Sequence, residues 1–335
     1  MLSNAIVQKF PGQLAKDLNK WIRVHKGSLD DYPGGEVIGE GATSVIFKSQ
    51  TSSGPRIIRI TDASALSEDE TIERLNDLRV ETEIMEAVQS KHVTKLFDTI
   101  ISDLNVCHIM EVAHSSLEVH IPDGGLTATR SMACMYQILE GLSFMHRNGF
   151  IHYDVKPANV LVFKNGLLKL TDFDVSARTV YGKPIDNYGD VAEKHEFRGS
   201  LSFMAPEVAG AWKIGDATKA DIFSAGRTFL FVLTKHRFFS RRGRKNLEQL
   251  ILDTLQKNPI TEAVRMMTET KTETCNRCKN LLLYTLNIRS ASRKPAAWIV
   301  NKMQTWTWRP SRYGFNLETS QRIVAEMVAE PALRF

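Results

Sequence analysis

The sequence predicts an α+β fold in which a small, β-rich first part is followed by a larger and mainly helical part. Short β-prone segments gather before about residue 112, and a single long helical pattern interrupts them. Beyond that point, the longest periodic segment repeats its apolar residues three and four positions apart, as a helix with one buried face does. The chain has 335 residues, enough for two lobes or one large domain.

Composition and charge are those of an ordinary soluble protein, with 43% hydrophobic and 24% charged residues. The net charge of +5 is too small to indicate nucleic-acid binding, so no nucleic-acid partner is expected. No apolar stretch reaches the roughly 18 residues of a membrane span. The amino terminus also lacks the apolar core of a secretory signal. We therefore expect an intracellular protein with no membrane partner.

The four cysteines do not form the spacing pattern of a disulfide framework, which favours a reducing compartment. They are Cys107, Cys134, Cys275 and Cys278. Cys275 and Cys278 could supply two zinc ligands, but a structural zinc site needs four. A zinc module is therefore an alternative with only half of its ligands in the sequence.

Residues 1–31 are predicted to form an extension ahead of the main domain. Trp21, Ile22 and Val24 lie close together within it, before a Gly-Ser pair. We expect this segment to pack on the fold through Trp21, because a large apolar side chain is usually buried. Recruitment of a partner is the alternative.

A glycine-rich turn between two β-prone flanks is the first candidate binding element. Residues without bulk at the tip of a hairpin allow backbone N–H groups to approach phosphate oxygens closely. The next strand candidate, Arg56–Ile60, carries Arg59. The turn and its flanks comprise Ile38, Gly39, Glu40, Gly41, Ala42, Thr43, Ser44 and Ile46.

Three further elements follow in order. A helix is predicted over Ser67–Val88, since acidic residues open it and apolar residues recur at helical spacing. A strand is predicted over Val106–Ala113. A long amphipathic helix then ends near Gly149, with Met132, Met135, Ile138, Leu139, Leu142 and Met145 on its apolar face. Asn165-Gly166 predicts a tight hairpin beyond it.

The residues that follow the long helix suit phosphoryl transfer. Asp154, Lys156 and Asn159 lie in the stretch His152–Asn159, and Asp172 comes soon after. A carboxylate can orient an attacking hydroxyl and accept its proton, while a lysine offsets charge on the phosphoryl group. An amide oxygen and a second carboxylate can hold magnesium. The alternative is a polar surface loop with chance acidic residues.

This stretch resembles the catalytic loop of eukaryotic protein kinases, H-R-D-x-x-x-x-N. Other kinase-like motifs follow in the family's order: Asp172-Phe-Asp174, Met204-Ala-Pro-Glu207 and Asp221-Ile-Phe-Ser-Ala-Gly226. The resemblance covers roughly residues 34–302 and implies the bilobal protein kinase fold. It implies a small β-rich N-lobe with one main helix over residues 32–112, a mainly helical C-lobe over 113–302, and a tail over 303–335.

The same resemblance assigns roles to individual residues. Asp154 is expected to be the catalytic base, with Lys156 at the γ-phosphate and Asn159 and Asp172 as ligands of Mg²⁺. ATP would contact the glycine-rich turn, Arg59 with Glu81 behind it, and the backbone from Glu111 to Ala113, which follows Met110. Ser200 and Glu207 mark the activation segment, and Arg293 is expected to pair with Glu207. Lys156 and Ser200 are typical of kinases that act on serine or threonine of protein substrates.

Several positions depart from the family pattern. Arg59 replaces a lysine, Ile57 a small alanine, Ser44 the third glycine and Asp174 the glycine of D-F-G. Arginine and lysine are not interchangeable at a precise site, and one misplaced electrostatic contact costs about 2.7–4 kcal/mol in catalysis. A catalytically impaired pseudokinase that acts as a nucleotide-binding or partner-binding scaffold is therefore the alternative to an active serine/threonine kinase.

Three other features concern regulation and partners. Tyr153 replaces the arginine that usually receives an activation-loop phosphate, so activity is expected not to depend on phosphorylation there. The basic cluster Arg241–Lys245 is expected to be a solvated loop, with a nuclear address or a docking patch for acidic partners as the alternatives. Trp306 and Trp308 are expected to pack the tail onto the C-lobe ahead of a helix over Leu317–Ala329. Oligomeric state does not follow from the sequence.

Overall fold

The computed structural model divides into two compact units. The first comprises residues up to Gln89 together with Thr94–Val112, and the second comprises Ser90–Val93 and the chain from Ala113 onward. The structure describes residues 12–41, 44–63, 66–102, 105–180, 183–184, 200–209, 215–235, 259–269, 276–306 and 315–329. Within these ranges no helix is both long and apolar enough to cross a membrane.

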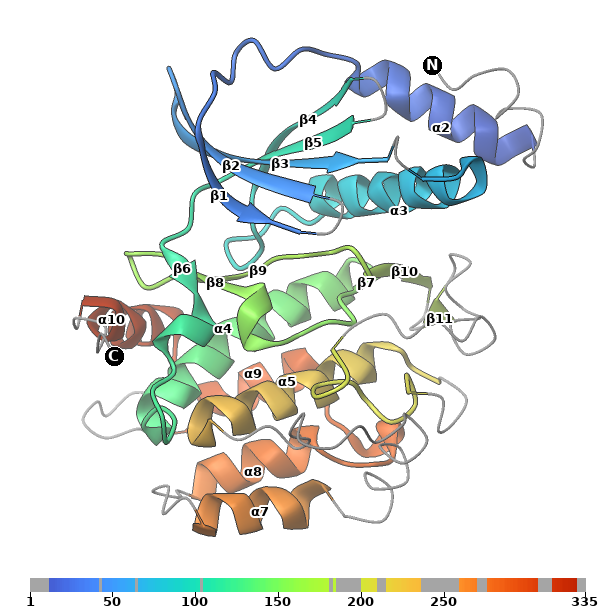
Figure 1. Ribbon diagram of the computed structural model, residues 1–335. Helices are drawn as coiled ribbons and strands as arrows, with labels where there is room; N and C mark the ends of the chain where they lie inside the picture. The colour runs from blue at the N-terminus through green and yellow to red at the C-terminus, as the bar shows by residue number, and fades with distance from the viewer. Residues whose placement is uncertain are drawn as a thin grey trace. The chain divides into compact units, whose positions relative to one another are not determined.

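The first unit is built on a five-stranded antiparallel sheet with the strand order β1-β2-β3-β5-β4 (Figure 1). Its strands are β1 (Glu36–Glu40), β2 (Ser44–Thr51), β3 (Gly54–Asp62), β4 (Leu96–Ser102) and β5 (Asn105–Met110). Arg59 in β3 lies directly opposite Ile46 in β2 and His108 in β5. Directly opposed residues point to the same face of a sheet, so these three side chains share one face.

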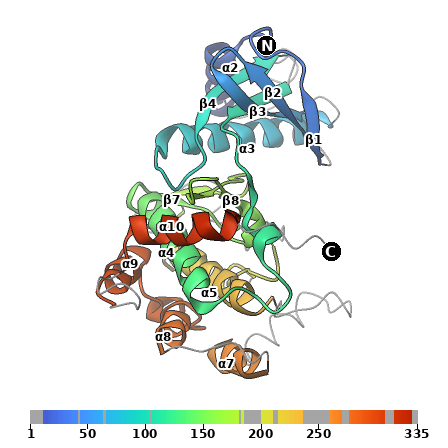
Figure 2. The same cartoon turned by 90° about the vertical axis from the view of Figure 1, so that its left-hand side faces the viewer.

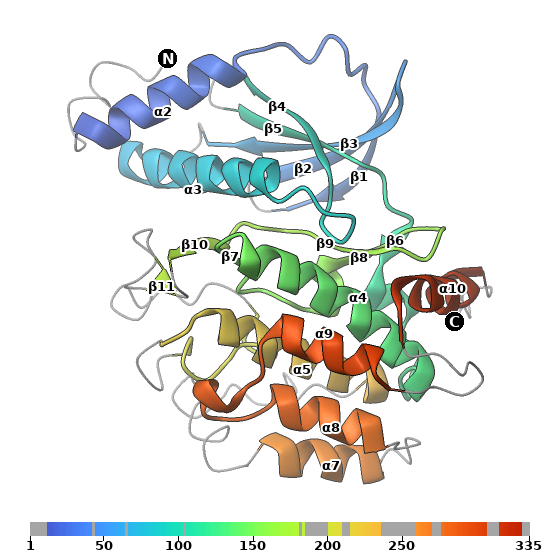
Figure 3. The ribbon, with the colours of Figure 1, turned by 180° about the vertical axis from the view of Figure 1, so that it is seen from behind.

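That face is covered by helix α3 (Glu68–Ala87), which begins with a capping box between Ser67 and Glu70. The predicted helix over Ser67–Val88 is therefore confirmed. Helix α2 (Gly12–His25) lies beside α3, as Figure 3 shows, and the two helices share a core with the sheet. The residues of that core are Leu18, Trp21, Ile22, Ala63, Ile72, Leu75, Leu78, Ile101 and Val106. Packing of the extension through Trp21 is thus confirmed.

The second unit is mainly helical and is organised around two buried helices, α4 (Ala128–Arg147) and α5 (Thr218–Thr234). All six apolar residues predicted for the buried face of α4 lie in its core. The other helices among the described residues are α7 (Pro259–Glu269), α8 (Asn276–Thr285), α9 (Ala296–Gln304) and α10 (Leu317–Ala329). With the sheet-rich first unit, this arrangement confirms the predicted α+β class.

The described part of the second unit also contains short strands and single turns. Two small sheets have the orders β6-β8-β9 and β11-β10-β7. Their strands are β6 (Ser115–Ser116), β7 (Phe150–Ile151), β8 (Val160–Val162), β9 (Leu168–Leu170), β10 (Ala177–Val180) and β11 (Lys183–Pro184). Three short 3₁₀ turns, η1 (Leu117–His120), η2 (Pro157–Asn159) and η4 (Ser290–Ser292), complete the described elements.

The hairpin between β8 and β9 differs in detail from the prediction. The turn is centred on Lys164 and Asn165, and Gly166 follows it with φ +79°. A Cβ atom at Gly166 would lie 1.9 Å from the carbonyl oxygen of Gln321 in α10, so only glycine fits. Glycine is therefore required after the turn rather than at its centre, because α10 packs closely there.

The tail is held to the second unit by a different aromatic residue from those expected. Helix α10 packs across α4 (Figure 2), and buried Phe315 lies with its ring 6.2 Å from that of Tyr136 in α4. Trp306 is only half-buried, and Trp308 lies outside the described residues. Packing of the tail onto this unit was predicted correctly, but the anchor is Phe315.

Two other expectations concern residues that the structure describes only in part. Cys278 is buried in α8, whereas Cys275 lies outside the described residues, as does the basic cluster Arg241–Lys245. Among the described residues, no group of three or more histidine, cysteine or acidic side chains could hold a metal ion. The structure thus adds no support for a zinc module.

We predict that Trp21→Ala destabilises the first unit by about 3–5 kcal/mol, because it removes a large buried side chain from the core shared by α2, α3 and the sheet. Chemical denaturation monitored by circular dichroism measures this change. The control is Val24→Ala on the same helix, where the side chain is 69% exposed. An equal effect of the two substitutions would contradict the packing role of α2.

Candidate active site

The first unit contributes a buried cation that is fixed by a glutamate from α3. The Nη2 atom of Arg59 lies 2.5 Å from Oε1 of Glu81, and both side chains are largely buried. The pair expected from the sequence is therefore present. Nη2 also lies 2.9 Å from Nδ1 of His108, a residue that the sequence did not single out. A charge-assisted contact of this length fixes the guanidinium group.

The glycine-rich turn joins β1 to β2 as a hairpin. The N–H of Gly41 donates to the carbonyl oxygen of Ser44 at 2.7 Å, which closes the tip. The predicted residues Ala42 and Thr43 lie outside the described residues. Ile38 bulges from the β1–β2 register and is 50% exposed, next to exposed Glu40. Gly41 and Ser44 therefore pair on either side of the turn, at the ends of the two strands.

The strand expected over Val106–Ala113 ends three residues early. β5 stops at Met110, and Glu111 continues its pairing with the chain before β4. The Glu111 N–H donates to the Lys95 carbonyl at 3.2 Å, and the Lys95 N–H donates to Oε1 of Glu111 at 2.6 Å. Ala113 begins the second unit. The side chain of Glu111 therefore orders the segment that was expected to contact adenine.

The catalytic loop in the second unit is anchored on the buried carboxylate of Asp221 in α5. Its Oδ2 accepts the N–H of His152 at 2.9 Å, and its Oδ1 accepts the N–H of Tyr153 at 2.8 Å. Nε2 of His146 in α4 lies 2.8 Å from the same Oδ2. The loop backbone needs this support because Tyr153 has φ +62°, which is strained for a residue other than glycine.

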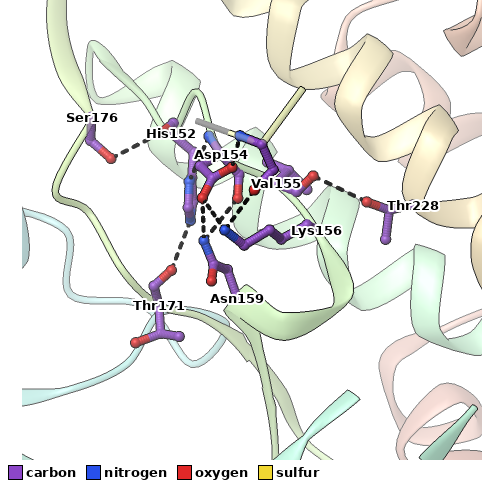
Figure 4. A network of polar contacts seen from close by, with 9 residues as sticks. His152, Asp154, Val155, Lys156, Asn159, Thr171, Ser176 and Thr228 are labelled. Atoms are coloured by element: carbon purple, nitrogen blue, oxygen red, sulfur yellow. Dashed lines mark hydrogen bonds and ion pairs between the residues drawn. The ribbon is translucent and has the colours of Figure 1, made fainter. Parts of the chain in front are cut away.

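His152 links the loop to the segment after β9. Its Nδ1 accepts the N–H of Asp154 at 3.3 Å, so its Nε2–H donates to the Thr171 carbonyl at 3.1 Å (Figure 4). The imidazole lies 5.2 Å from the ring of buried Phe173. From the other side, the hydroxyl of Thr228 in α5 donates to the Val155 carbonyl. The loop is therefore held at several successive residues.

Asp154 lies at the centre of the contacts in Figure 4. Its Oδ2 accepts from Nζ of Lys156 at 2.5 Å and from Nδ2 of Asn159 at 2.9 Å. Its Oδ1 accepts the backbone N–H of Ser200 at 2.8 Å, and Lys156 also donates to the Ser200 hydroxyl. Three residues predicted for the catalytic loop and one predicted for the activation segment are thus brought together.

Asn159 and Asp172 provide oxygen ligands of the kind that magnesium prefers. The contacts of the Asn159 side chain with Asp154 use its Nδ2, so its Oδ1 is turned away from Asp154. The N–H of Thr171 donates to the Asn159 carbonyl, which brings the residue before Asp172 to Asn159. An amide oxygen and a carboxylate suit a hard cation, so these residues fit Mg²⁺.

Two departures from the expected motifs have local structural explanations. Asp174 is not among the residues with positive φ, so its backbone does not use the freedom that glycine would supply. Tyr153 is buried, and burial, reinforced by the charges of Asp221 and Glu207, raises the pKa of its hydroxyl. Tyr153 therefore stays a neutral phenol, in contrast to the positively charged arginine of the family pattern.

Glu207 and Arg293 form a buried, two-pronged ion pair, as expected. Nη1 and Nη2 of Arg293 contact Oε1 and Oε2 of Glu207 at 2.5 and 2.9 Å. Arg293 also donates to the carbonyls of Asn287, Lys219 and Ile288. The end of the activation segment is thereby fixed to the helical core, since breaking such a pair leaves a buried charge uncompensated.

The sequence reasoning missed two histidines that hold this machinery, His108 and His146. A signal for His108 was available. Strand alternation places it on the same face as Val106 and Met110, where a polar residue requires a partner. His146 gave no such signal, because its partner Asp221 lies in a distant helix.

Comparison with known proteins agrees with these motifs. A family model described as the protein kinase domain matches residues 32–304. The chain is 29% identical over 235 residues to a probable serine/threonine-protein kinase of Dictyostelium discoideum, a match that covers 69% of this chain and 44% of the relative. It is 29% identical over 195 residues to the serine/threonine-protein kinase ppk11 of Schizosaccharomyces pombe, with 58% of each chain covered. The chain thus spans about half the length of these relatives.

We predict that Asp221→Asn destabilises the catalytic loop by about 1–3 kcal/mol, because an amide must turn its NH₂ toward one of the two backbone donors. Amide hydrogen exchange at His152 and Tyr153, combined with thermal unfolding, measures the loss. Asp216→Asn serves as the control, since Asp216 is exposed and caps the start of α5. Unchanged exchange at both amides would contradict the anchoring role of Asp221.

Proposed function

Since the chain belongs to the protein kinase family, we propose that it transfers the γ-phosphoryl group of ATP to serine or threonine hydroxyls of protein substrates. The observation that carries this proposal is the constellation around Asp154, whose carboxylate is contacted by Lys156, Asn159 and Ser200. A scaffold that only binds partners has no chemical need for all of these groups together.

Each residue of this constellation has a separate task in the transfer. One oxygen of Asp154 accepts the proton of the acceptor hydroxyl as that hydroxyl attacks the γ-phosphorus and ADP leaves. Lys156 offsets negative charge on the phosphoryl group. Asn159 and Asp172 would hold Mg²⁺, which when bound neutralises charge on the phosphate oxygens. Arg59, fixed by Glu81, is the cation for the remaining phosphates.

The contacts of Ser200 support serine and threonine as acceptors. Its backbone N–H and its hydroxyl are bonded to Asp154 and Lys156 respectively, so the activation segment lies against the base. Lys156 and Ser200 are the two residues typical of kinases that act on serine or threonine, and they are in direct contact here. Both matched relatives bear the name serine/threonine-protein kinase, which supports the same assignment.

The geometry also supports activity without phosphorylation of the activation segment. In this chain the residue before Asp154 is neutral Tyr153, which cannot bind a phosphate as an arginine would. The loop is instead held by Asp221, His146 and Thr228, which are all present before any modification. A catalytically impaired, nucleotide-binding scaffold is the second candidate, and the arginine at position 59 favours it.

We predict that the protein phosphorylates a generic basic protein with Mg-ATP and that Asp154→Asn lowers kcat by about 10²–10⁴-fold, as expected when a general base is lost. Radiolabel transfer followed by phosphoamino-acid analysis measures both the rate and the acceptor. The control is Asp123→Asn at an exposed turn of the same unit.

Transfer at background level by the wild-type protein, unchanged in Asp154→Asn, would overturn the enzymatic proposal. A thermal shift with Mg-ATP then separates the two scaffold versions. Nucleotide at a hundredfold excess over Kd stabilises a binding protein by about 2.7 kcal/mol. Stabilisation without transfer would therefore identify a nucleotide-binding scaffold, and no stabilisation would count against both ATP-dependent functions.

A further inference from the structure

His108 is fully buried in the central part of the first unit, with polar partners for both of its ring nitrogens. Its Nδ1 lies 2.9 Å from Nη2 of Arg59, and its Nε2 lies 2.9 Å from the hydroxyl oxygen of Thr82 in α3. The Thr82 hydroxyl in turn donates to the Leu78 carbonyl at 2.7 Å. A chain of contacts thus runs from the guanidinium group of Arg59 to the backbone of α3.

The directions of these hydrogen bonds follow from the chemistry of arginine. A guanidinium group only donates, so Nδ1 of His108 must accept and carry no proton. The ring proton of the neutral imidazole then lies on Nε2 and is donated to Thr82. Thr82 can accept it because its own proton goes to Leu78. Every proton in the chain is therefore assigned, and His108 offers a lone pair to Arg59.

The two acceptors use the whole donor capacity of one guanidinium nitrogen. Nη2 carries two protons, and it contacts Oε1 of Glu81 and Nδ1 of His108. Any contact of Arg59 with a phosphate must therefore come from the other nitrogens of the group. Two acceptors at different positions, one on the helix and one on the neighbouring strand, constrain the plane of the guanidinium group more than either does by itself.

Sheet register explains why position 108 can perform this task. Arg59 and His108 are directly opposed in the antiparallel pair of β3 and β5, so their side chains leave the sheet side by side. Lysine is shorter than arginine and ends in a single nitrogen. A lysine at position 59 would present one compact ammonium group with no plane to orient, so His108 could not position it as it positions the guanidinium group.

We propose that His108 is a positioning residue that orients the guanidinium group of Arg59 toward nucleotide phosphates, and so lets an arginine serve at this position. The inference rests on the proposed function, because it assigns nucleotide phosphates as the ligand of Arg59. It predicts that positions 59 and 108 are energetically coupled. His108 should matter for nucleotide binding only while residue 59 is arginine.

A double-mutant cycle on the full chain tests this coupling. We predict that His108→Val weakens binding of Mg-ATP about tenfold in the protein that has Arg59, as expected for one hydrogen bond to a charged group. In the Arg59→Lys background the same substitution should change the affinity less than about twofold. Isothermal titration calorimetry with Mg-ATP measures all four affinities, and kcat and KM for ATP provide a second readout.

Three further variants distinguish positioning from packing. His108→Gln retains one acceptor and one donor, so it should keep the affinity within about threefold of wild type. Thr82→Val removes the acceptor behind His108 without touching Arg59, and should weaken binding in an Arg59-dependent manner even if His108→Val fails to fold. The control is Thr99→Val, which alters the β4 residue directly opposite His108 and should leave the affinity unchanged.

The outcomes separate this inference from the function on which it rests. Equal losses from His108→Val, or from Thr82→Val, in the arginine and lysine backgrounds would overturn the positioning role and indicate packing alone. Full affinity in both variants would overturn it as well. Wild-type protein that binds no Mg-ATP would overturn the proposed function together with the inference, whereas binding without coupling overturns the inference alone.

Discussion

The carboxylate of Asp221 is the contact on which the geometry of the second unit depends. It accepts the backbone N–H groups of His152 and Tyr153 from inside the helical core, and it holds Tyr153 in a backbone conformation with positive φ. The next residue is Asp154, whose carboxylate can meet Lys156, Asn159 and Ser200 only if the loop takes this path. A buried charge on a helix therefore fixes a base that belongs to a loop.

The first unit departs from the family pattern at its buried cation, because Arg59 stands where the pattern has lysine. The guanidinium group is held by Glu81 from the helix and by His108 from the neighbouring strand. Two other departures from the pattern need no added contacts of this kind. Asp174 adopts a backbone conformation that does not require glycine, and Tyr153 is buried and neutral. The departure that needs added contacts is thus the cation of the first unit, and not the residues around Asp154.

Much of this architecture could be predicted from the sequence, where the signal is local. Ser67 and Glu70 mark the start of α3, and the helical spacing of apolar residues identifies the buried face of α4. Family resemblance predicted the pairs Arg59–Glu81 and Glu207–Arg293. What escaped prediction depends on contacts between distant segments. The partners of His108 lie on another strand and on a helix, Gly166 is required because α10 packs against it, and the tail is anchored by Phe315 against Tyr136.

We propose that this loop is competent as folded, because Asp221 already holds its backbone and the neutral Tyr153 cannot receive a phosphate as an arginine would. The most direct test is the initial rate of phosphoryl transfer by protein freed of phosphate with a phosphatase and verified by intact mass. The account predicts transfer at the full rate from the first turnover, with no lag. A lag that shortens as the activation segment becomes phosphorylated, or activity that appears only after that modification, would contradict it.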